Sequence, residues 1–214
     1  MIKQLAPLPE FLVSRYKNWK STSYSNNANK FKKLASFGQN PSSMVISCCD
    51  SRVHVTSIFG ADEGEFFIHR NIANLVPRYS PDGEHHGTSA AIEYATKELK
   101  IRHLIILGHT GCGGIKSGHS LHTNNLNPNY VFINKWLNIL LPAFNNISKN
   151  ISQKNQIEQL EEESIKNSLN NLFSFPNIKK EVENKSLLIH GLIHDIGSGG
   201  LKYLNPITEE FENL

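Results

Sequence analysis

Short apolar runs separated by polar or glycine positions dominate the chain from residue 44 onward. Four of them have the length and apolar content of β-strands: MVISCC, EFFIHR, HLIILG and SLLIHG. Between the second and the third lies GTSAAIEYATKELK, which predicts a helix with Thr88 or Ser89 as its N-cap. The residues that this helix would bury are Ala91, Ile92, Ala95 and Leu99. The order strand, helix, strand indicates parallel strands joined by a right-handed crossover, and hence an α/β fold.

The first part of the chain has a helical pattern instead. Residues 1–37 predict two helical stretches that are interrupted by the polar segment STSYSNNAN. Phe11, Leu12 and Tyr16 are spaced so that they share one helix face. We therefore expect an arm that packs against another surface.

Two further helices are predicted after residue 124. VFINKWLNILLPAF forms one of them, and Pro142 ends or kinks it. QIEQLEEESIKNSLNNLFSFP forms a longer amphipathic helix that Pro176 ends. The acidic run Glu161–Glu163 in this helix is interpreted as a solvated face, because runs of like charge usually face water.

Length and composition indicate a single folded domain. The chain has 214 residues, and 39% of them are hydrophobic, which excludes a disordered chain. No apolar run approaches the ~18 residues of a membrane span. The N-terminal stretch MIKQLAPLPEFLVSRYKNWK lacks the apolar core and small-residue cleavage site of a secretory signal. We therefore expect a cytoplasmic protein that has no membrane partner.

Charge and cysteine content reduce the number of possible functions further. The net charge is +3, and the basic residues are scattered, so there is no reason to expect nucleic-acid binding. Three cysteines in a reducing compartment are too few for a disulfide scaffold. They are interpreted as metal ligands or reactive thiols.

Two short segments contain nearly all the reactive residues. CCDSR, at 48–52, follows the first predicted strand, and GHTGCGG, at 108–114, follows the third. Both lie at the carboxyl ends of parallel strands, which is the edge where open α/β sheets bind ligands. Two thiolates and one imidazole form a ligand set that suits Zn²⁺. Glycines around His109 and Cys112 give the backbone the freedom to direct both side chains at one ion.

These segments also have other interpretations. A lone cysteine at a strand end is more often packing than ligand, and the spacing H-x2-C alone is weak. The adjacent Cys48 and Cys49 suggest redox chemistry, but neighbouring residues of a strand point to opposite faces and cannot both address one site. A phosphate-binding loop is excluded, because Ile115 separates Gly114 from Lys116 and breaks the required spacing.

Taken together, the motifs resemble those of the beta-class carbonic anhydrases. C-x-D-S-R precedes G-H-x2-C-G-G by about 60 residues, with RNIANLVP and HGTSAAIEYA between them, and the similarity runs from about Gly38 through LLIHGLIHDIGSGGL to the end. The resemblance implies a Zn²⁺ cofactor. Its implied ligands are Cys48, His109 and Cys112.

The same resemblance implies the roles of five other residues. Asp50 and Arg52 would form a catalytic carboxylate–guanidinium pair, in which Asp50 orients the nucleophile. If that pair opens, the Asp50 carboxylate becomes the fourth zinc ligand in a closed, inactive state. The residues that would line the substrate pocket are Gln39, Phe67 and Tyr94.

The implied fold is a mainly parallel central sheet of four strands plus an edge strand, flanked by helices. Residues 1–214 would form one domain, in which the helical arm at 1–37 packs on a partner subunit. Family members are dimers or assemblies of dimers, so a homodimer or a dimer of dimers is implied.

Three positions depart from the family pattern. Cys49 stands where a small thiol-free residue is common, and Gly111 replaces a larger residue between the histidine and cysteine ligands. Val45 occupies the position that carries Trp in the bicarbonate-regulated subset, although Arg70 remains. The last departure argues against allosteric inhibition by bicarbonate.

The expected function is zinc-dependent, reversible hydration of carbon dioxide to bicarbonate and a proton. Two alternatives stay open: hydrolysis of carbon disulfide or carbonyl sulfide at the same site, and a non-catalytic zinc or bicarbonate-sensing module. The proton carrier is also open. His85, His86 and His54 are candidates, but surface roles are favoured for them, and His190 and His194 are assigned structural roles.

Overall fold

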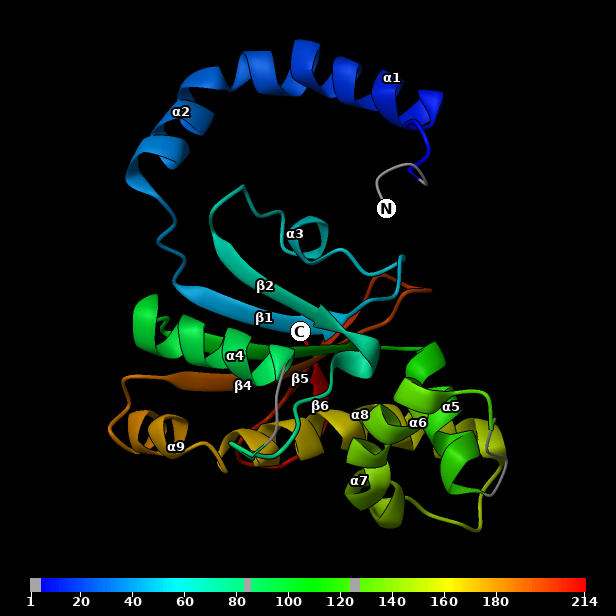
Figure 1. Ribbon diagram of the computed structural model, residues 1–214. Coiled ribbons are helices and arrows are strands. Elements are labelled where there is room, and N and C mark those ends of the chain that lie inside the picture. The colour runs from blue at the N-terminus through cyan, green and yellow to red at the C-terminus, as the bar shows by residue number, and fades with distance from the viewer. Residues whose placement is uncertain (1–4, 83–85, 124–127) are drawn as a thin grey trace. The chain divides into compact units, whose positions relative to one another are not determined.

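The chain forms two compact units, which a computed structural model describes over residues 5–82, 86–123 and 128–214 (Figure 1). The units are Met1–Asn40, which includes the predicted arm, and Pro41–Leu214, which includes all the predicted strands. In the described ranges, no helix has both the length and the apolar character needed to span a membrane.

The first unit is helical. Its elements are α1 (Glu10–Trp19), the π-helical turn η2 (Lys20–Tyr24) and α2 (Ala28–Phe37). The predicted interruption over STSYSNNAN is too long, since helical structure continues to Tyr24. Polar side chains support this continuation by bonding to the backbone, as Thr22 Oγ1 does by donating to the Asn18 carbonyl at 2.7 Å.

Aromatic side chains in this unit divide into two groups. The rings of Trp19, Tyr24 and Phe31 contact one another, with centroids 5.1–5.9 Å apart, and so join the helices. Phe11 and Tyr16 are more than half exposed, at 57% and 56%, although the Tyr16 ring also lies 6.2 Å from that of Trp19. The predicted apolar face of the arm is therefore available for a partner, and its packing on another subunit stays a prediction.

The second unit is built on one sheet. Its described residues form six strands in the order β2-β1-β3-β4-β5-β6, of which the first four are parallel and the last two antiparallel. The strands are β1 (Ser43–Cys48), β2 (Phe66–Asn71), β3 (His103–His109), β4 (Leu188–His194), β5 (Leu201–Leu204) and β6 (Phe211–Asn213). The predicted mainly parallel sheet is confirmed.

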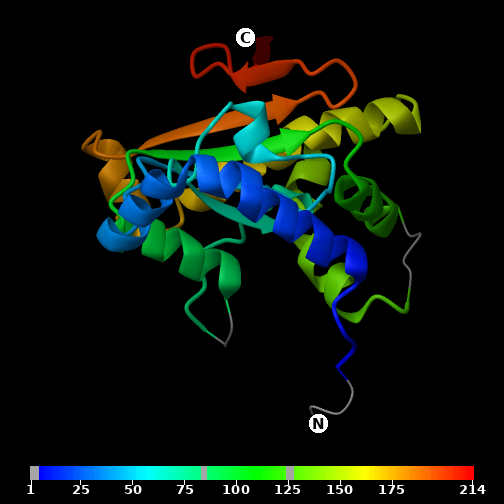
Figure 2. The same ribbon diagram turned by 90° about the horizontal axis from the view of Figure 1, so that it is seen from above.

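The antiparallel edge contains one strand more than was predicted (Figure 2). The Asn205 side chain accepts hydrogen bonds from the backbone N–H groups of Ile207 at 2.8 Å and Thr208 at 3.4 Å, which closes a tight turn. The chain then returns to pair with β5 as β6. With three residues, FEN, β6 is too short to show an apolar pattern.

Helices cover the two faces of the sheet unequally. The described helices and helical turns of this unit are α3 (Val55–Ile58), η3 (Ile72–Asn74), α4 (Gly87–Glu93), η4 (Tyr94–Glu98), α5 (Gly113–His122), α6 (Val131–Leu137), η5 (Asn138–Leu140), α7 (Leu141–Asn146), α8 (Gln153–Leu172) and α9 (Pro176–Glu183). The main core packs α4, α8 and α9 against one sheet face, while α3 lies on the other (Figure 1).

Two local predictions about helices differ in outcome. The predicted N-cap of the helix after β2 is wrong, because α4 begins at Gly87 and Thr88 lies inside its first turn. The buried Thr88 hydroxyl instead lies 3.0 Å from His69 Nε2. The two prolines do separate helices: Pro142 lies in the first turn of α7, and Pro176 begins α9 after α8 has ended.

Candidate metal centre

The reactive side chains come from two segments that follow parallel strands. Cys48 is the last residue of β1, and His109 is the last residue of β3, which pairs with β1. Cys112 precedes α5 after a turn in which Gly111 has a φ of 67°. That left-handed conformation favours glycine. We call residues 48–53 the ligand loop and residues 109–112 the ligand turn; they meet at the carboxyl edge of the sheet, as predicted.

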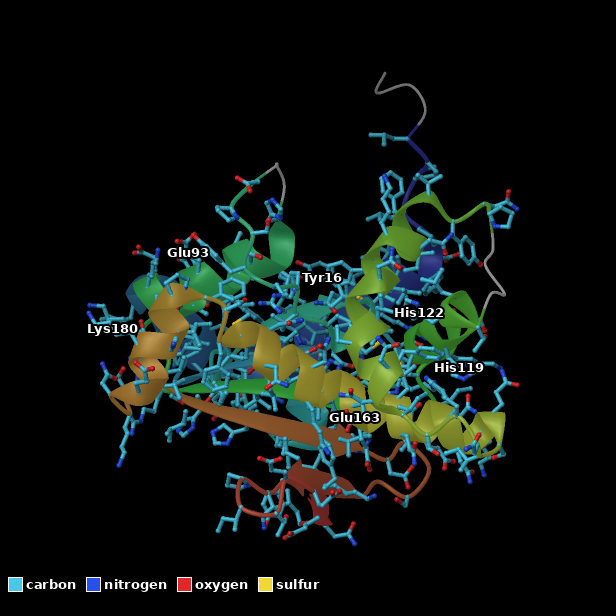
Figure 3. All side chains as sticks on the ribbon, turned by 90° about the horizontal axis from the view of Figure 1, so that it is seen from below. Tyr16, Glu93, His119, His122, Glu163 and Lys180 are labelled. Atoms are coloured by element: carbon cyan, nitrogen blue, oxygen red, sulfur yellow. The ribbon has the colours of Figure 1, made fainter. Side chains whose placement is uncertain are left out.

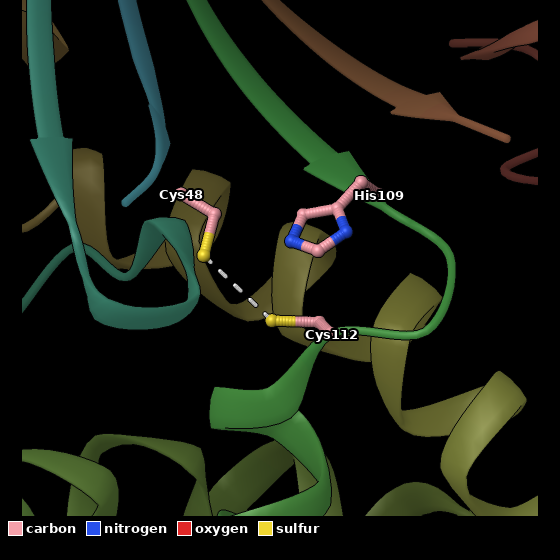
Figure 4. A group of neighbouring side chains, drawn as sticks. All are labelled: Cys48, His109 and Cys112. Atoms are coloured by element: carbon pink, nitrogen blue, oxygen red, sulfur yellow. Dashed lines mark hydrogen bonds between the residues drawn. The ribbon is translucent and has the colours of Figure 1, made fainter. Parts of the chain in front are cut away.

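Cys48, His109 and Cys112 point toward one another and form the metal group (Figure 4). The two Sγ atoms are 3.8 Å apart, and the possible ligand atoms of the three buried residues all lie within 4.8 Å of one another. His109 Nδ1 lies 3.0 Å from the Thr110 carbonyl oxygen, while its buried Nε2 has no hydrogen-bond partner in the described ranges. A free imidazole nitrogen beside two thiols is a donor set that fits zinc.

Hydrogen bonds within the metal group favour a thiolate. The pKa of Cys48 is lowered to about 4, first by its hydrogen bond with Cys112 and then by His109, although burial opposes this. Backbone N–H groups of Asp50 and Ala73 lower it further. Burial also opposes a charge on His109, but its pKa is raised by the neighbouring Cys48 thiolate. The hydrogen bond with Cys48 and burial raise the pKa of Cys112 well above its usual range, so the metal-free site stabilises one anionic sulfur, that of Cys48.

Asp50 and Arg52 form a bidentate pair beside the metal group. Arg52 Nε donates to Asp50 Oδ1 at 2.9 Å, and Arg52 Nη2 donates to Asp50 Oδ2 at 2.7 Å. This guanidinium holds the pKa of Asp50 well below its usual range. Arg52 Nη2 also donates to the Gly111 carbonyl at 3.1 Å and so links the ligand loop to the ligand turn. Asp50 Oδ2 lies 4.0 Å from His109 Nε2.

Arg70 holds the backbone of the ligand loop, which the sequence analysis did not foresee. Its guanidinium donates to three carbonyl oxygens, those of Cys48 at 2.8 Å, Asp50 at 2.7 Å and Val53 at 2.9 Å. Val45, on the neighbouring strand, is fully buried. The arginine that is shared with the bicarbonate-regulated subset is therefore engaged within the chain itself.

Cys49 lies apart from the metal group. It is exposed, whereas Cys48 is buried, and its N–H donates to the carbonyl of Asn71 at 2.9 Å. This agrees with the alternation of side chains that the sequence analysis used to separate the two cysteines.

Two of the three predicted pocket residues, Phe67 and Tyr94, lie together at a distance from the metal group of their own chain. Phe67 and Tyr94 contact each other, with ring centroids 5.8 Å apart. Phe67 pairs with Met44, four positions before Cys48, which corresponds to about 13 Å along the strand. Gln39 belongs to the first unit and is exposed. Their role in a substrate pocket stays a prediction.

The described histidines that were candidates for proton transfer contact groups close to them in sequence. His54 Nδ1 lies 2.9 Å from Thr56 Oγ1 at the start of α3, and His86 Nε2 lies 2.9 Å from the Asp82 carbonyl oxygen. His85 lies outside the described residues. These contacts fit the surface roles that the sequence analysis favoured.

Two pairs of histidines on other elements also lie outside the metal group. His190 Nε2 contacts His103 Nδ1 on the neighbouring strand at 3.0 Å, which fits the structural role expected of it. His119 and His122 lie on α5 (Figure 3), where His119 Nε2 contacts Gln156 Oε1 at 2.7 Å.

The interpretation of Glu161–Glu163 as a solvated face is wrong for Glu161. This residue is only 4% exposed, and its Oε1 accepts a hydrogen bond from Cys112 N at 2.9 Å. Burial raises the pKa of Glu161 to about 7. A sequence signal for its burial existed, because Glu161 lies four residues from both Ile157 and Ile165 and so shares their helix face.

Comparisons with known proteins show relatives over most of the chain. Residues 43–201 match the family described as carbonic anhydrase. Beta carbonic anhydrase 3 of Arabidopsis thaliana is 35% identical over 193 residues, which cover 89% of this chain and 74% of that protein. The structure of the beta-carbonic anhydrase CcaA aligns with a TM-score of 0.88 at 26% identity, covering 96% of this chain and 91% of its own. A structure of the tetrameric beta-carbonic anhydrases of Sordaria macrospora aligns with a TM-score of 0.76 at 30% identity, covering 91% and 95%.

Proposed function

The chain belongs to the beta class of the carbonic anhydrase family, and on this premise we propose that Cys48, His109 and Cys112 hold its zinc ion. As a carbonic anhydrase it catalyses the reversible hydration of carbon dioxide to bicarbonate. The observation that carries the assignment is the free, buried Nε2 of His109 between two thiols. When bound, zinc acts as a Lewis acid and allows water to act as a nucleophile near neutral pH.

Asp50 and Arg52 orient the attacking water. The Asp50 carboxylate lies at the edge of the metal group, where it accepts a hydrogen bond from the attacking water and directs its lone pair at carbon dioxide. Arg52 donates to both carboxylate oxygens, so Asp50 stays ionised and its carboxylate keeps its orientation toward the metal group. Release of this grip would let Asp50 turn to the metal as a fourth ligand, which is the closed state. The paired, bidentate geometry supports catalysis over a purely structural metal site.

The apolar pocket for carbon dioxide requires a second copy of the chain. Phe67 and Tyr94 contact each other at the end of the sheet away from Cys48, so they are suited to the metal group of a partner rather than their own. We assign Gln39 to the same shared pocket, where its amide would bind a substrate oxygen. A homodimer, alone or paired into a tetramer, is the smallest assembly that completes each site.

Mixing two inactive variants tests the shared pocket. Phe67→Ala damages the pocket, and Cys112→Ser damages the metal group. If the pocket serves the partner, co-expressed chains form mixed dimers in which one site has both an intact metal group and an intact pocket, and activity returns. If each chain used its own pocket, the mixture would stay as inactive as the two variants alone.

Stopped-flow measurement of carbon dioxide hydration, with and without a zinc chelator, tests the function as a whole. We expect loss of activity with chelator and recovery on addition of zinc. Parallel assays with carbonyl sulfide and carbon disulfide separate hydration from hydrolysis of these related molecules. Full zinc occupancy without turnover of any of them would favour a non-catalytic module.

A further inference from the structure

Glu161 is a buried carboxylate that the proposed reaction does not use. It lies on α8, where Leu160 and Ile165 are also buried, and it is only 4% exposed. Burying a carboxylate costs several kcal/mol unless hydrogen bonds compensate, so such a group normally has a specific partner. Here the partner is the backbone N–H of Cys112, at 2.9 Å from Glu161 Oε1.

The N–H of Cys112 needs this partner because of its place in the chain. Cys112 is the N-cap residue of α5, and no side chain of its own segment caps the helix. The first N–H groups of a helix have no partner within the helix, and a negative charge near that end is favourable. A carboxylate from α8, 49 positions away in sequence, meets both needs.

The rest of the ligand turn is held from the opposite side. Thr110 N donates to the His194 carbonyl at 3.0 Å, and Thr110 Oγ1 donates to Asp195 Oδ1 at 2.9 Å. These contacts hold the His109 end of the turn to the end of β4. At the other end of the ligand turn, Glu161 accepts the hydrogen bond from the backbone N–H of Cys112 itself.

We propose that Glu161 is a positioning residue of the metal centre, whose carboxylate fixes the backbone of Cys112 so that Sγ faces Cys48 and His109. This inference rests on the proposed ligand set. A buried N–H group without an acceptor destabilises the folded chain, which explains why an oxygen acceptor is kept at this buried position. Removal of such outer contacts typically lowers metal affinity about 10–100-fold.

Zinc affinity separates this role from a general contribution to folding. Zinc-loaded wild type, Glu161→Leu and Glu161→Gln are titrated with a chromogenic chelator, and the unfolding midpoint of each metal-free protein is measured alongside. Glu162→Gln is the matched control, since Glu162 is the next residue of α8 and pairs with Lys202 at 3.6 Å instead. We expect zinc affinity to fall about 10–100-fold in Glu161→Leu. Glutamine retains an oxygen acceptor, so Glu161→Gln should stay within a few-fold of wild type.

Cobalt(II) substitution adds a readout of geometry. The visible bands of the cobalt-loaded protein depend on how the thiolates and the imidazole are arranged around the ion, so we expect them to shift in Glu161→Leu and not in the control. If leucine prevents folding, Glu161→Ser replaces it, because serine is too short to reach Cys112, and the same loss of affinity is expected.

Three results would overturn the proposal. Unchanged zinc affinity and cobalt spectrum in folded Glu161→Leu would show that the contact does not position Cys112. An equal loss in Glu161→Leu and Glu161→Gln would rule out the hydrogen-bond acceptor as the cause. A wild-type chain that binds no zinc would remove the ligand set itself and the inference with it, which is distinct from failure of the variants alone.

Discussion

The ligand loop and the ligand turn reach the same site but are held by opposite charges. In the loop, the guanidinium of Arg70 gathers three backbone carbonyl oxygens. In the turn, the carboxylate of Glu161 takes the backbone N–H of Cys112, and Asp195 takes the hydroxyl of Thr110. Irregular backbone leaves its polar groups unpaired, so each segment is stabilised by a side chain whose charge matches the groups that it exposes. Arg52 joins the two, since it binds Asp50 in the loop and the Gly111 carbonyl in the turn.

The largest expected effect comes from removing a ligand of the turn. Cys112→Ser replaces a soft thiolate by a hydroxyl, so the chain should lose zinc and with it essentially all hydration activity, more than the ~100-fold typical of an outer contact. Metal analysis of the purified variant together with stopped-flow hydration measures both. Full zinc retention in this variant would mean that Cys112 is not a ligand.

The next effect tests the link between loop and turn. Arg52→Ala frees Asp50, so we expect activity to fall about 10–100-fold while zinc stays bound. Arg52→Lys should also be poor, because an ammonium cannot hold the two carboxylate oxygens in parallel. Hydration rates are compared at equal zinc content. Near wild-type turnover in zinc-replete Arg52→Ala would remove the pair from the mechanism and leave the metal alone responsible.

A smaller effect is expected from loosening the loop alone. Arg70→Lys cannot bridge the carbonyls of Cys48, Asp50 and Val53 together, so the free energy of unfolding should fall by about 1–2 kcal/mol. Chemical denaturation of the zinc-loaded proteins measures it. Because Asp50 keeps Arg52, activity should fall less than in Arg52→Ala. A larger loss of activity than in Arg52→Ala would mean that the loop backbone matters more than the carboxylate pair.

The engagement of Arg70 also bears on bicarbonate. With Val45 buried and Arg70 bonded to the loop, we expect ordinary product inhibition by bicarbonate and no sigmoidal dependence. Hydration rates over a range of bicarbonate concentrations provide the measurement. A sigmoidal curve would show that Arg70 leaves the loop to bind the ion.

The smallest effect is expected at Cys49. Its side chain is exposed and lies outside the metal group, so Cys49→Ser should keep zinc content and hydration rate within about twofold of wild type. It is the matched control for Cys112→Ser, since both replace a thiol by a hydroxyl. Loss of zinc from Cys49→Ser would reverse the assignment of the two adjacent cysteines.

The sequence by itself determined the mainly parallel sheet and the edge at which its reactive residues gather. Buried strands appear in the sequence as short apolar runs, and parallel strands end at one edge, so the segments 48–52 and 108–114 could be brought together from their positions. The choice of Cys48, His109 and Cys112 as ligands came from the family resemblance. The glycine of the turn was likewise readable, because a positive φ favours that residue.

Only the tertiary structure decided what surrounds these ligands. The contact of Glu161 with Cys112 spans 49 positions, and that of Arg70 with Cys48 spans 22, so neither leaves a local pattern. A run of glutamates resembles a solvated face until the rotation of α8 against the sheet shows which member is buried. The distance of Phe67 from Cys48 likewise follows from strand register, which depends on how the buried faces of neighbouring strands match. Periodicity specifies which side chains face inward along one element, whereas the packing of elements that are distant in sequence decides which of them meet.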